Sequence, residues 1–126
     1  MKKLLILLFS ILISFNSYGE WTEITVNNEG VVFYVDKDTI KEHDGYVYWW
    51  DLGNSKKLIV GTLSAEFYEE GDCGINRYRT LSFIFYKQPM GEGEGIKDNP
   101  QNPEWLYPTP SSVEGQILDF VCDYVK

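Results

Sequence analysis

Short runs of hydrophobic residues, separated by polar turn residues, follow one another along most of the chain. Such runs are rich in aromatic and β-branched side chains, which is typical of antiparallel strands. In the last run Leu81, Phe83 and Phe85 alternate with Thr80 and Ser82, so one face of that strand is expected to be buried and the other exposed to solvent. The expected strands are residues 21–26, 31–36, 46–52, 58–68 and 77–87.

The connections between these runs are short. Residues 27–30 and 53–55 have the composition of turns, and residues 38–41 are expected to form one short helical turn. Parallel strands need a crossover of a dozen or more residues, which these connections do not provide. The sheet is therefore predicted to be antiparallel.

Residues 88–110 differ in composition from the rest of the chain. They contain Gly91, Gly93 and Gly95 together with all of the chain's prolines, which argues against regular structure. The segment is expected to be one long loop. It is either a mobile, functional loop or a hairpin tip followed by an ordered crossing.

The C-terminal segment predicts a helix. Ser111, followed three residues later by Glu114, has the spacing of a capping box, with Pro110 just outside it. The helix should run to about Tyr124. With a helical period, its apolar positions cover more than half of the surface, so the helix is expected to pack on the sheet. These positions are Val113, Ile117, Leu118, Phe120, Val121, Cys122, Tyr124 and Val125.

The N-terminal residues have the order of a secretory signal peptide. Lys2 and Lys3 precede an apolar run over residues 4–15, and small residues at Ser17 and Gly19 follow it. The run is shorter than the roughly 20 residues that a membrane-spanning helix needs. We therefore expect a signal peptide at residues 1–19 and a single exported domain at residues 20–126. No cysteine stands at the cleavage site, so no lipid anchor is expected, and the location is either the periplasm or the cell surface and exterior.

The chain has two cysteines, Cys73 and Cys122. In an exported protein they are expected to form a disulfide, here between the end of the fourth strand and the margin of the helix. A metal pair or a reactive thiol would need a CxxC spacing or a neighbouring base, and neither is present.

The charge is strongly acidic. Removal of Lys2 and Lys3 changes the net charge from −8 to −10. Scattered, outnumbered cations argue against binding to nucleic acid and against adsorption to anionic lipid. The charge is expected either to favour a cationic partner or only to maintain solubility.

The sequence offers no catalytic, cofactor-binding or metal-binding set. His43 is the only histidine and lies in a turn-like sequence, Glu42 to Gly45, which is expected to be exposed. Glu66, Glu69 and Glu70 are the carboxylates nearest to an acid–base arrangement, but acids are so frequent that such groups are expected without a catalytic purpose. The protein is therefore predicted not to be an enzyme and to carry no cofactor.

Four aromatic residues are candidates for contact with a partner. Trp49 and Trp50 are consecutive in a strand, so each side of the sheet receives one of them, and one is expected to be core. The other either meets a partner or is covered by the helix or the long loop. Trp105 and Tyr107, between two prolines, are expected either to plug the loop onto the core, which we favour, or to serve as an exposed anchor.

The order of landmarks resembles that of the surface-adhesin protein E family of bacterial exported proteins. The resemblance spans nearly the whole chain after residue 19. It is carried by Trp21, Tyr34-Val35-Asp36, Thr39-Ile40-Lys41, Tyr48-Trp49, Ser64, Cys73 with Arg77, the glycines at 91–95, Trp105 and Val121-Cys122. The resemblance implies an antiparallel sheet with a C-terminal helix held by a disulfide, and a surface protein that binds host extracellular-matrix and plasma proteins. The chain departs from lipid-anchored members because it lacks the lipidation cysteine.

The expected fold is thus α+β, with an antiparallel sheet of about five or six strands and one C-terminal helix packed on it. The expected function is that of an exported, non-enzymatic, adhesin-like binding protein for host extracellular-matrix or plasma proteins. The alternative is a periplasmic inhibitor or structural protein that binds a cationic envelope partner such as a lysozyme.

Overall fold

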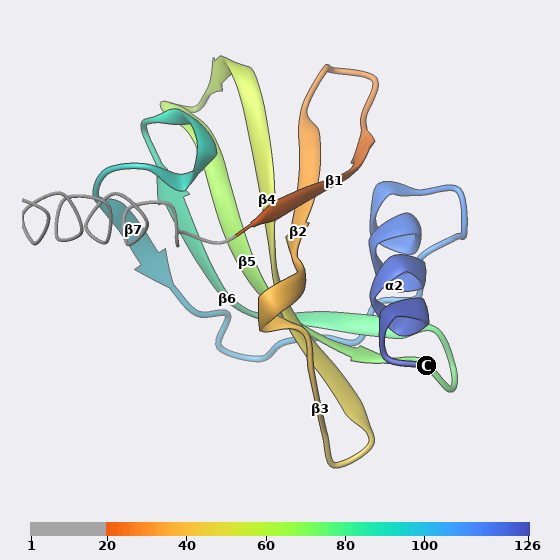
Figure 1. The fold of residues 1–126 in the computed structure, drawn as a ribbon. Coiled ribbons are helices and arrows are strands. Elements are labelled where there is room, and N and C mark those ends of the chain that lie inside the picture. The colour runs from red at the N-terminus through yellow and green to blue at the C-terminus, as the bar shows by residue number, and fades with distance from the viewer. Residues whose placement is uncertain (1–19) are drawn as a thin grey trace, which may run out of the picture.

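The computed structural model describes residues 20–126, and the expected signal peptide at residues 1–19 lies outside the described residues. The fold is an antiparallel sheet in the order β1-β2-β4-β5-β6-β7, with β3 paired to β4 (Figure 1). One helix, α2, spans Val113–Tyr124. The strands are β1 Trp21–Val26, β2 Val32–Asp36, β3 Lys41–His43, β4 Tyr46–Ile59, β5 Thr62–Asp72, β6 Arg77–Tyr86 and β7 Gly95–Asp98. The predicted α+β architecture is confirmed. Within the described part, no helix has the length and apolar character needed to cross a membrane.

The turn predicted at residues 53–55 is wrong, because β4 continues through it to Ile59. Gly53 pairs with Phe33 on β2 and with Ala65 on β5. A Cβ atom at Gly53 would lie 3.2 Å from the Phe33 ring, so this glycine makes room for an aromatic neighbour and does not form a turn. The chain reverses instead at Val60 and Gly61, which divide the strand predicted at residues 58–68.

The segment 88–110 contains regular structure, so the prediction of one long loop is wrong. A 3-10 turn, η2, spans Pro89–Gly91, and β7 pairs with β6 from Tyr86↔Gly95 to Phe83↔Asp98. Further on, Leu106 and Tyr78 exchange two backbone hydrogen bonds of 2.8 and 3.0 Å. The segment is an ordered crossing, in agreement with the second of the two alternatives.

The helical turn predicted at residues 38–41 is a 3-10 turn, η1, at Lys37–Thr39. Lys41 belongs to β3 instead. The Thr39 hydroxyl accepts a 3.0 Å hydrogen bond from the Trp50 backbone N–H, which attaches this turn to β4.

The predicted capping box at Ser111 and Glu114 is wrong by one residue. Ser112 is the N-cap of α2, and its hydroxyl accepts a 3.0 Å hydrogen bond from the Gly115 N–H. The third helical residue is therefore Gly115, which cannot return a side-chain bond to the cap. The predicted end at Tyr124 is confirmed.

The core lies between α2 and one face of the sheet. From the sheet it contains Val35, Val47 and Trp49, all at most 2% exposed. From the helix it contains Ile117, Leu118 and Val121. The helix covers the region of β1 and β4 in Figure 1 and leaves the other sheet face without a helix. That second face is called the open face below.

The predicted disulfide between Cys73 and Cys122 is confirmed. Cys73 is the first residue after β5, and Cys122 lies in the last turn of α2. Their Cα atoms are 5.8 Å apart, although the residues are separated by 49 positions in the sequence. The bond therefore fastens the C-terminal end of the helix to the sheet.

Candidate partner-binding face

The open face carries a row of aromatic side chains. Trp50 on β4 packs against Tyr68 on β5, with ring centroids 5.1 Å apart, and Tyr68 lies 6.1 Å from Tyr48. Successive strand residues point to opposite faces, so Trp50 lies opposite the core residue Trp49. Trp50 is half-buried, which leaves part of its ring available to a partner.

A cavity of about 810 Å³ lies beside this row. One wall is Trp50, and another is Trp21, which pairs with Asp36 across β1 and β2. Its carboxylates are Asp36 from β2, Glu66 from β5 and Glu92 from the segment after η2. The cavity thus combines two indole rings with acidic side chains.

Two of these carboxylates are poorly solvated. Burial raises the pKa of the Asp36 carboxyl and of the Glu66 carboxyl above their usual values. Asp36 accepts a 3.1 Å hydrogen bond from the Asp38 backbone N–H, and none of the lining residues is a lysine or arginine. A cation in this cavity would therefore gain interaction with carboxylates that no cationic side chain of the lining neutralises.

The polypeptide around η2 is fixed against the sheet. Ser64 donates a hydrogen bond of 2.6 Å to the Gln88 carbonyl and accepts one of 2.9 Å from the Gly91 N–H. The Asn54 side chain accepts a 2.7 Å bond from the Met90 N–H. These bonds hold the glycine-rich segment as one wall of the cavity, although its sequence alone resembled a free loop.

Trp105 is packed against β6 at the far end of the row. The guanidinium groups of Arg77 and Arg79 lie 4.1 and 4.3 Å from its ring centroid, and Tyr46 lies 5.6 Å away. Trp105 is half-buried by these contacts. Tyr107, in contrast, is 65% exposed.

The four predicted contact residues therefore occupy different places. Trp49 is 1% exposed and belongs to the core, so it is not available to a partner. Trp50 lies on the open face, and Trp105 and Tyr107 lie near its other end. Sequence reasoning missed Trp21, Asp36 and Glu66 as neighbours of Trp50, because only the strand register brings them together.

The glutamates considered for acid–base chemistry do not converge. Glu66 and Glu70 belong to the open face, whereas Glu69 is buried on the helix side. Glu70 accepts hydrogen bonds from the Tyr48 hydroxyl and from Arg79, which makes it part of a structural network. His43 is exposed and pairs with Asp44 at 3.2 Å in the turn after β3.

Two acids are buried together under the N-terminal end of α2. Asp51 is 4% exposed and accepts a 2.9 Å hydrogen bond from Trp49 Nε1. Glu69 is 7% exposed and accepts a hydrogen bond from the Thr80 hydroxyl. They line a cavity of about 160 Å³ with Glu114 of the helix.

Burial and mutual repulsion perturb this pair. They raise the pKa of the Asp51 carboxyl well above its usual value, and burial raises the pKa of Glu69 to about 7. No histidine, lysine or cysteine lines that cavity. Among residues 20–126 there is also no group of three or more His, Cys, Asp or Glu side chains that could hold a metal ion.

Comparison with known proteins identifies the family of the chain. The family model described as Surface-adhesin protein E matches residues 21–123. No curated protein sequence matches the chain.

Solved structures of similar fold include two of Haemophilus influenzae protein E. Crystal form II has a TM-score of 0.67 and 18% identity, with 84% of this chain and 90% of that chain covered. Protein E from non-typeable Haemophilus influenzae has a TM-score of 0.63 and 20% identity, with coverages of 80% and 75%. At these identities the structures establish the fold, while the family model spans nearly all of the described residues. The chain therefore belongs to the surface-adhesin protein E family.

Proposed function

We propose that this chain is an exported, non-enzymatic, adhesin-like protein that binds a basic segment of another protein on its open face. The observation that supports this most directly is the cavity of about 810 Å³ that is lined by Trp21, Trp50, Asp36 and Glu66. Membership of an adhesin family agrees with a protein partner.

The cavity has the chemistry to hold a lysine or arginine side chain. A cation over an indole ring is attracted by the ring's electron-rich face, by about 0.5–2 kcal/mol depending on desolvation. Carboxylates such as Glu66 add a direct ion pair, and arginine is well suited because its planar group stacks and donates several hydrogen bonds. The acidic remainder of the chain would also speed the approach of a basic partner.

The proposed partners are host extracellular-matrix or plasma proteins, and membership of a surface-adhesin family supports a protein partner in general. The proposed organisation is a signal peptide at residues 1–19 and a binding domain at 20–126, which N-terminal sequencing of the exported protein would test. Trp50 is the proposed central contact, and Tyr107 and Trp105 are proposed as peripheral ones.

The test is a binding measurement with immobilised matrix and plasma proteins. We expect saturable binding at micromolar concentration or below, weakened about tenfold by Trp50→Ala and several-fold by Glu66→Gln. Tyr124→Ala is a matched control, since Tyr124 is an aromatic residue 52% exposed on α2, away from the open face. Circular dichroism would establish that each variant is folded. Lack of binding to the whole panel, or equal binding by Trp50→Ala and wild type, would contradict the proposal.

A cationic envelope protein such as a lysozyme is the alternative partner, and the same cavity supports it. A lysozyme activity assay separates the two possibilities. Inhibition that is lost in Glu66→Gln and weakened by salt would favour the inhibitor, as would retention of the protein in the periplasm.

A further inference from the structure

The turn between β4 and β5 exposes three consecutive aliphatic residues. Leu58 is 66% exposed, Ile59 is 47% exposed and Val60 is 99% exposed. Lys56 and Lys57, directly before them, are also exposed. Residues 56–61 are called the hairpin tip below.

Val60 has a backbone conformation that its side chain disfavours. Its φ is +48° and that of Gly61 is +76°. Ile59 pairs with Thr62, so Val60 and Gly61 alone form the turn. Such turns usually contain Asn-Gly, and a β-branched residue at positive φ is a genuine outlier. Because Val60 is 99% exposed, packing within the chain does not compensate for this strain.

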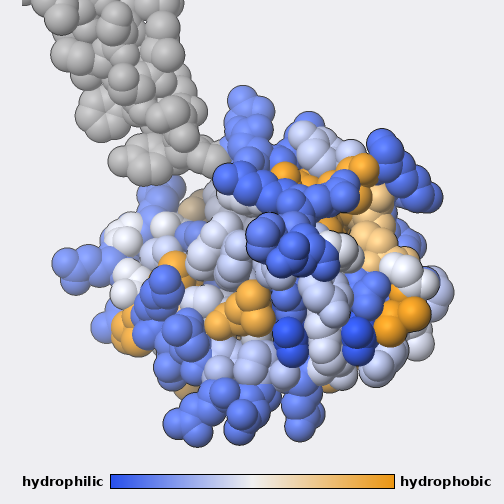
Figure 2. All heavy atoms as spheres, turned by 90° about the horizontal axis from the view of Figure 1, so that it is seen from below, coloured by the Kyte–Doolittle hydropathy of each residue, from blue (hydrophilic) through white to orange (hydrophobic). Residues whose placement is uncertain are grey.

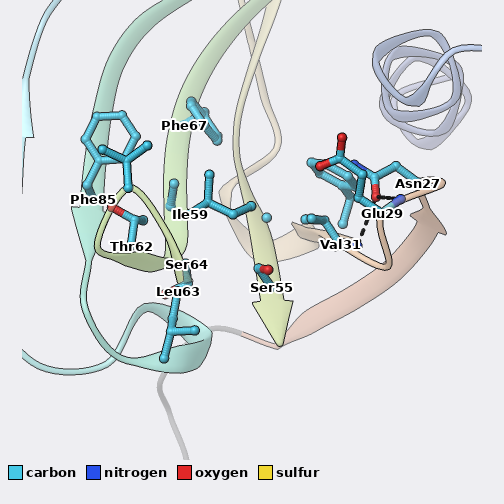
Figure 3. Close-up of a pocket in the computed structure, with 14 residues that line it drawn as sticks. Asn27, Glu29, Val31, Ser55, Ile59, Thr62, Leu63, Ser64, Phe67 and Phe85 are labelled. Atoms are coloured by element: carbon cyan, nitrogen blue, oxygen red, sulfur yellow. Dashed lines mark hydrogen bonds between the residues drawn. The ribbon is translucent and has the colours of Figure 1, made fainter. Parts of the chain in front are cut away.

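The hairpin tip is continuous with an apolar groove of about 570 Å³ on the helix side of the sheet. Figure 3 shows Ile59 near Phe67 and Phe85, with Val31 across the groove. Glu29 is the only acid among the lining residues, and it belongs to the β1–β2 turn on the far rim. The opposite end of the molecule, where β3 turns into β4, is mainly hydrophilic (Figure 2).

The composition of the hairpin tip fits lipid better than protein. Energetically dominant residues of protein interfaces are usually Trp, Tyr and Arg, whereas Leu and Val are under-represented among them. Exposed aliphatic side chains beside lysines match the two layers of a bilayer interface: acyl chains accept the aliphatics, and anionic headgroups attract the lysines.

We infer that the hairpin tip is a membrane-docking element, which inserts Leu58, Ile59 and Val60 into the interface of an anionic lipid bilayer. Lys56 and Lys57 bind the headgroups. The acidic remainder of the chain is repelled by the same surface, so the molecule docks through this tip alone. The net charge of the whole chain argues against adsorption to anionic lipid. That net charge does not describe the hairpin tip, where two cations and three aliphatic side chains are adjacent.

The test is co-sedimentation of the processed, disulfide-bonded protein with vesicles. Mixed phosphatidylcholine–phosphatidylglycerol vesicles are compared with pure phosphatidylcholine vesicles. We expect binding to the mixed vesicles, weakened about tenfold by Leu58→Ser and by Val60→Asn, since each removes an inserted aliphatic group. Replacing both lysines, Lys56→Gln with Lys57→Gln, should remove the preference for phosphatidylglycerol, because each lysine contributes about fivefold.

Ile75→Ser is the matched control. Ile75 is an aliphatic residue 55% exposed in the turn between β5 and β6, at the other end of β5. The Ile75→Ser variant should bind the mixed vesicles as tightly as the wild-type protein. Val60→Asn creates an Asn-Gly turn, so it should unfold at a temperature no lower than wild type, and its weaker binding would not reflect misfolding.

Three results would overturn the inference. Wild-type protein fails to sediment with the mixed vesicles, Leu58→Ser and Val60→Asn bind them as tightly as wild type, or Ile75→Ser loses as much binding as they do. Capture of a soluble protein by the hairpin tip without vesicle binding would equally show that the tip serves another class of partner.

Discussion

Glu69 and Asp51 are carboxylic acids in a place where sequence patterns lead one to expect apolar side chains. Both lie under the N-terminal end of α2, where Glu114 faces them from the helix, Trp49 and Thr80 supply hydrogen bonds, and Tyr78 lines the same cavity. Desolvation favours the neutral form of each acid, and ionisation of one makes ionisation of the other harder. This pair therefore makes stability depend on pH.

The direction of that dependence follows from the raised pKa values. The pKa of Glu69 in the fold is about 7, above that of the unfolded chain, so the unfolded state loses its proton first as pH rises. The contribution of Glu69 to the free energy of unfolding is fully present below its unfolded pKa of about 4.5 and is lost as the pH rises through about 7. The free energy of unfolding should therefore fall by about 2 kcal/mol between pH 5 and pH 8. Urea unfolding at the two pH values measures this difference.

Glu69→Gln is the control for that measurement. Its amide keeps an acceptor for the Thr80 hydroxyl but cannot ionise. We expect a smaller fall in stability between the two pH values, with the remainder due to Asp51. A variant with the full pH dependence of wild type would show that other groups cause it.

Alternation along β4 predicted correctly that the two adjacent tryptophans lie on opposite faces. The sequence pattern of β5 did not predict the burial of Glu69, because a strand pattern gives the face of a residue but not what covers that face. The neighbours of Trp50 escaped prediction for the same reason. Trp21, Asp36 and Glu66 come from three other positions along the chain, and only the register of β1, β2 and β5 joins them.

At the scale of the element, α2 begins one residue later than its sequence indicated. Ser111 and Ser112 are adjacent and both are good N-cap residues, so the choice is made by the preceding crossing, in which the Ser112 N–H and hydroxyl both donate to the Thr109 carbonyl. The two serines therefore provide a matched pair.

We expect Ser112→Ala to lower the free energy of unfolding by about 1 kcal/mol, because the Gly115 N–H loses its side-chain acceptor. Ser111→Ala should change it little, since only the Ser111 backbone carbonyl forms a bond, with Gln116. Chemical denaturation of the two variants compares them directly. Equal losses, or a larger loss in Ser111→Ala, would mean that the cap is assigned to the wrong serine.

The strand predictions were wrong where a glycine fits either a turn or the interior of a strand. Gly53 looks like a turn residue but lies inside β4 beside the Phe33 ring, whereas the real turn contains Val60, which no turn preference would select. β7 was missed because its four residues follow a glycine-rich segment and depend on β6 for pairing. In each case a contact with a distant strand overrides the local preference.

At the scale of the whole molecule, the disulfide connects the two layers of the fold. Reduction should lower the free energy of unfolding by about 4 kcal/mol on the chain-entropy model, because the bond closes a loop of nearly 50 residues. Urea unfolding with and without a reductant measures the loss.

The double variant Cys73→Ser and Cys122→Ser should resemble the reduced protein. A loss below about 1 kcal/mol in both would show that packing of α2 alone fixes the helix on the sheet. The pairing itself was predictable from the sequence, because two cysteines in an exported chain leave one simple arrangement.

The Cys73–Cys122 bond also makes the stability of the fold depend on the cellular compartment. Thiols stay reduced in the cytosol and are oxidised outside it. A newly made chain therefore lacks a large part of its final stability until it has left the compartment of synthesis. A translocation channel that transports unfolded polypeptides would therefore meet a reduced chain, which is easier to unfold. Oxidation after transport would stabilise the folded state and so make unfolding for a return passage unfavourable. The bond thus stabilises the native fold only after the chain has left the cytosol.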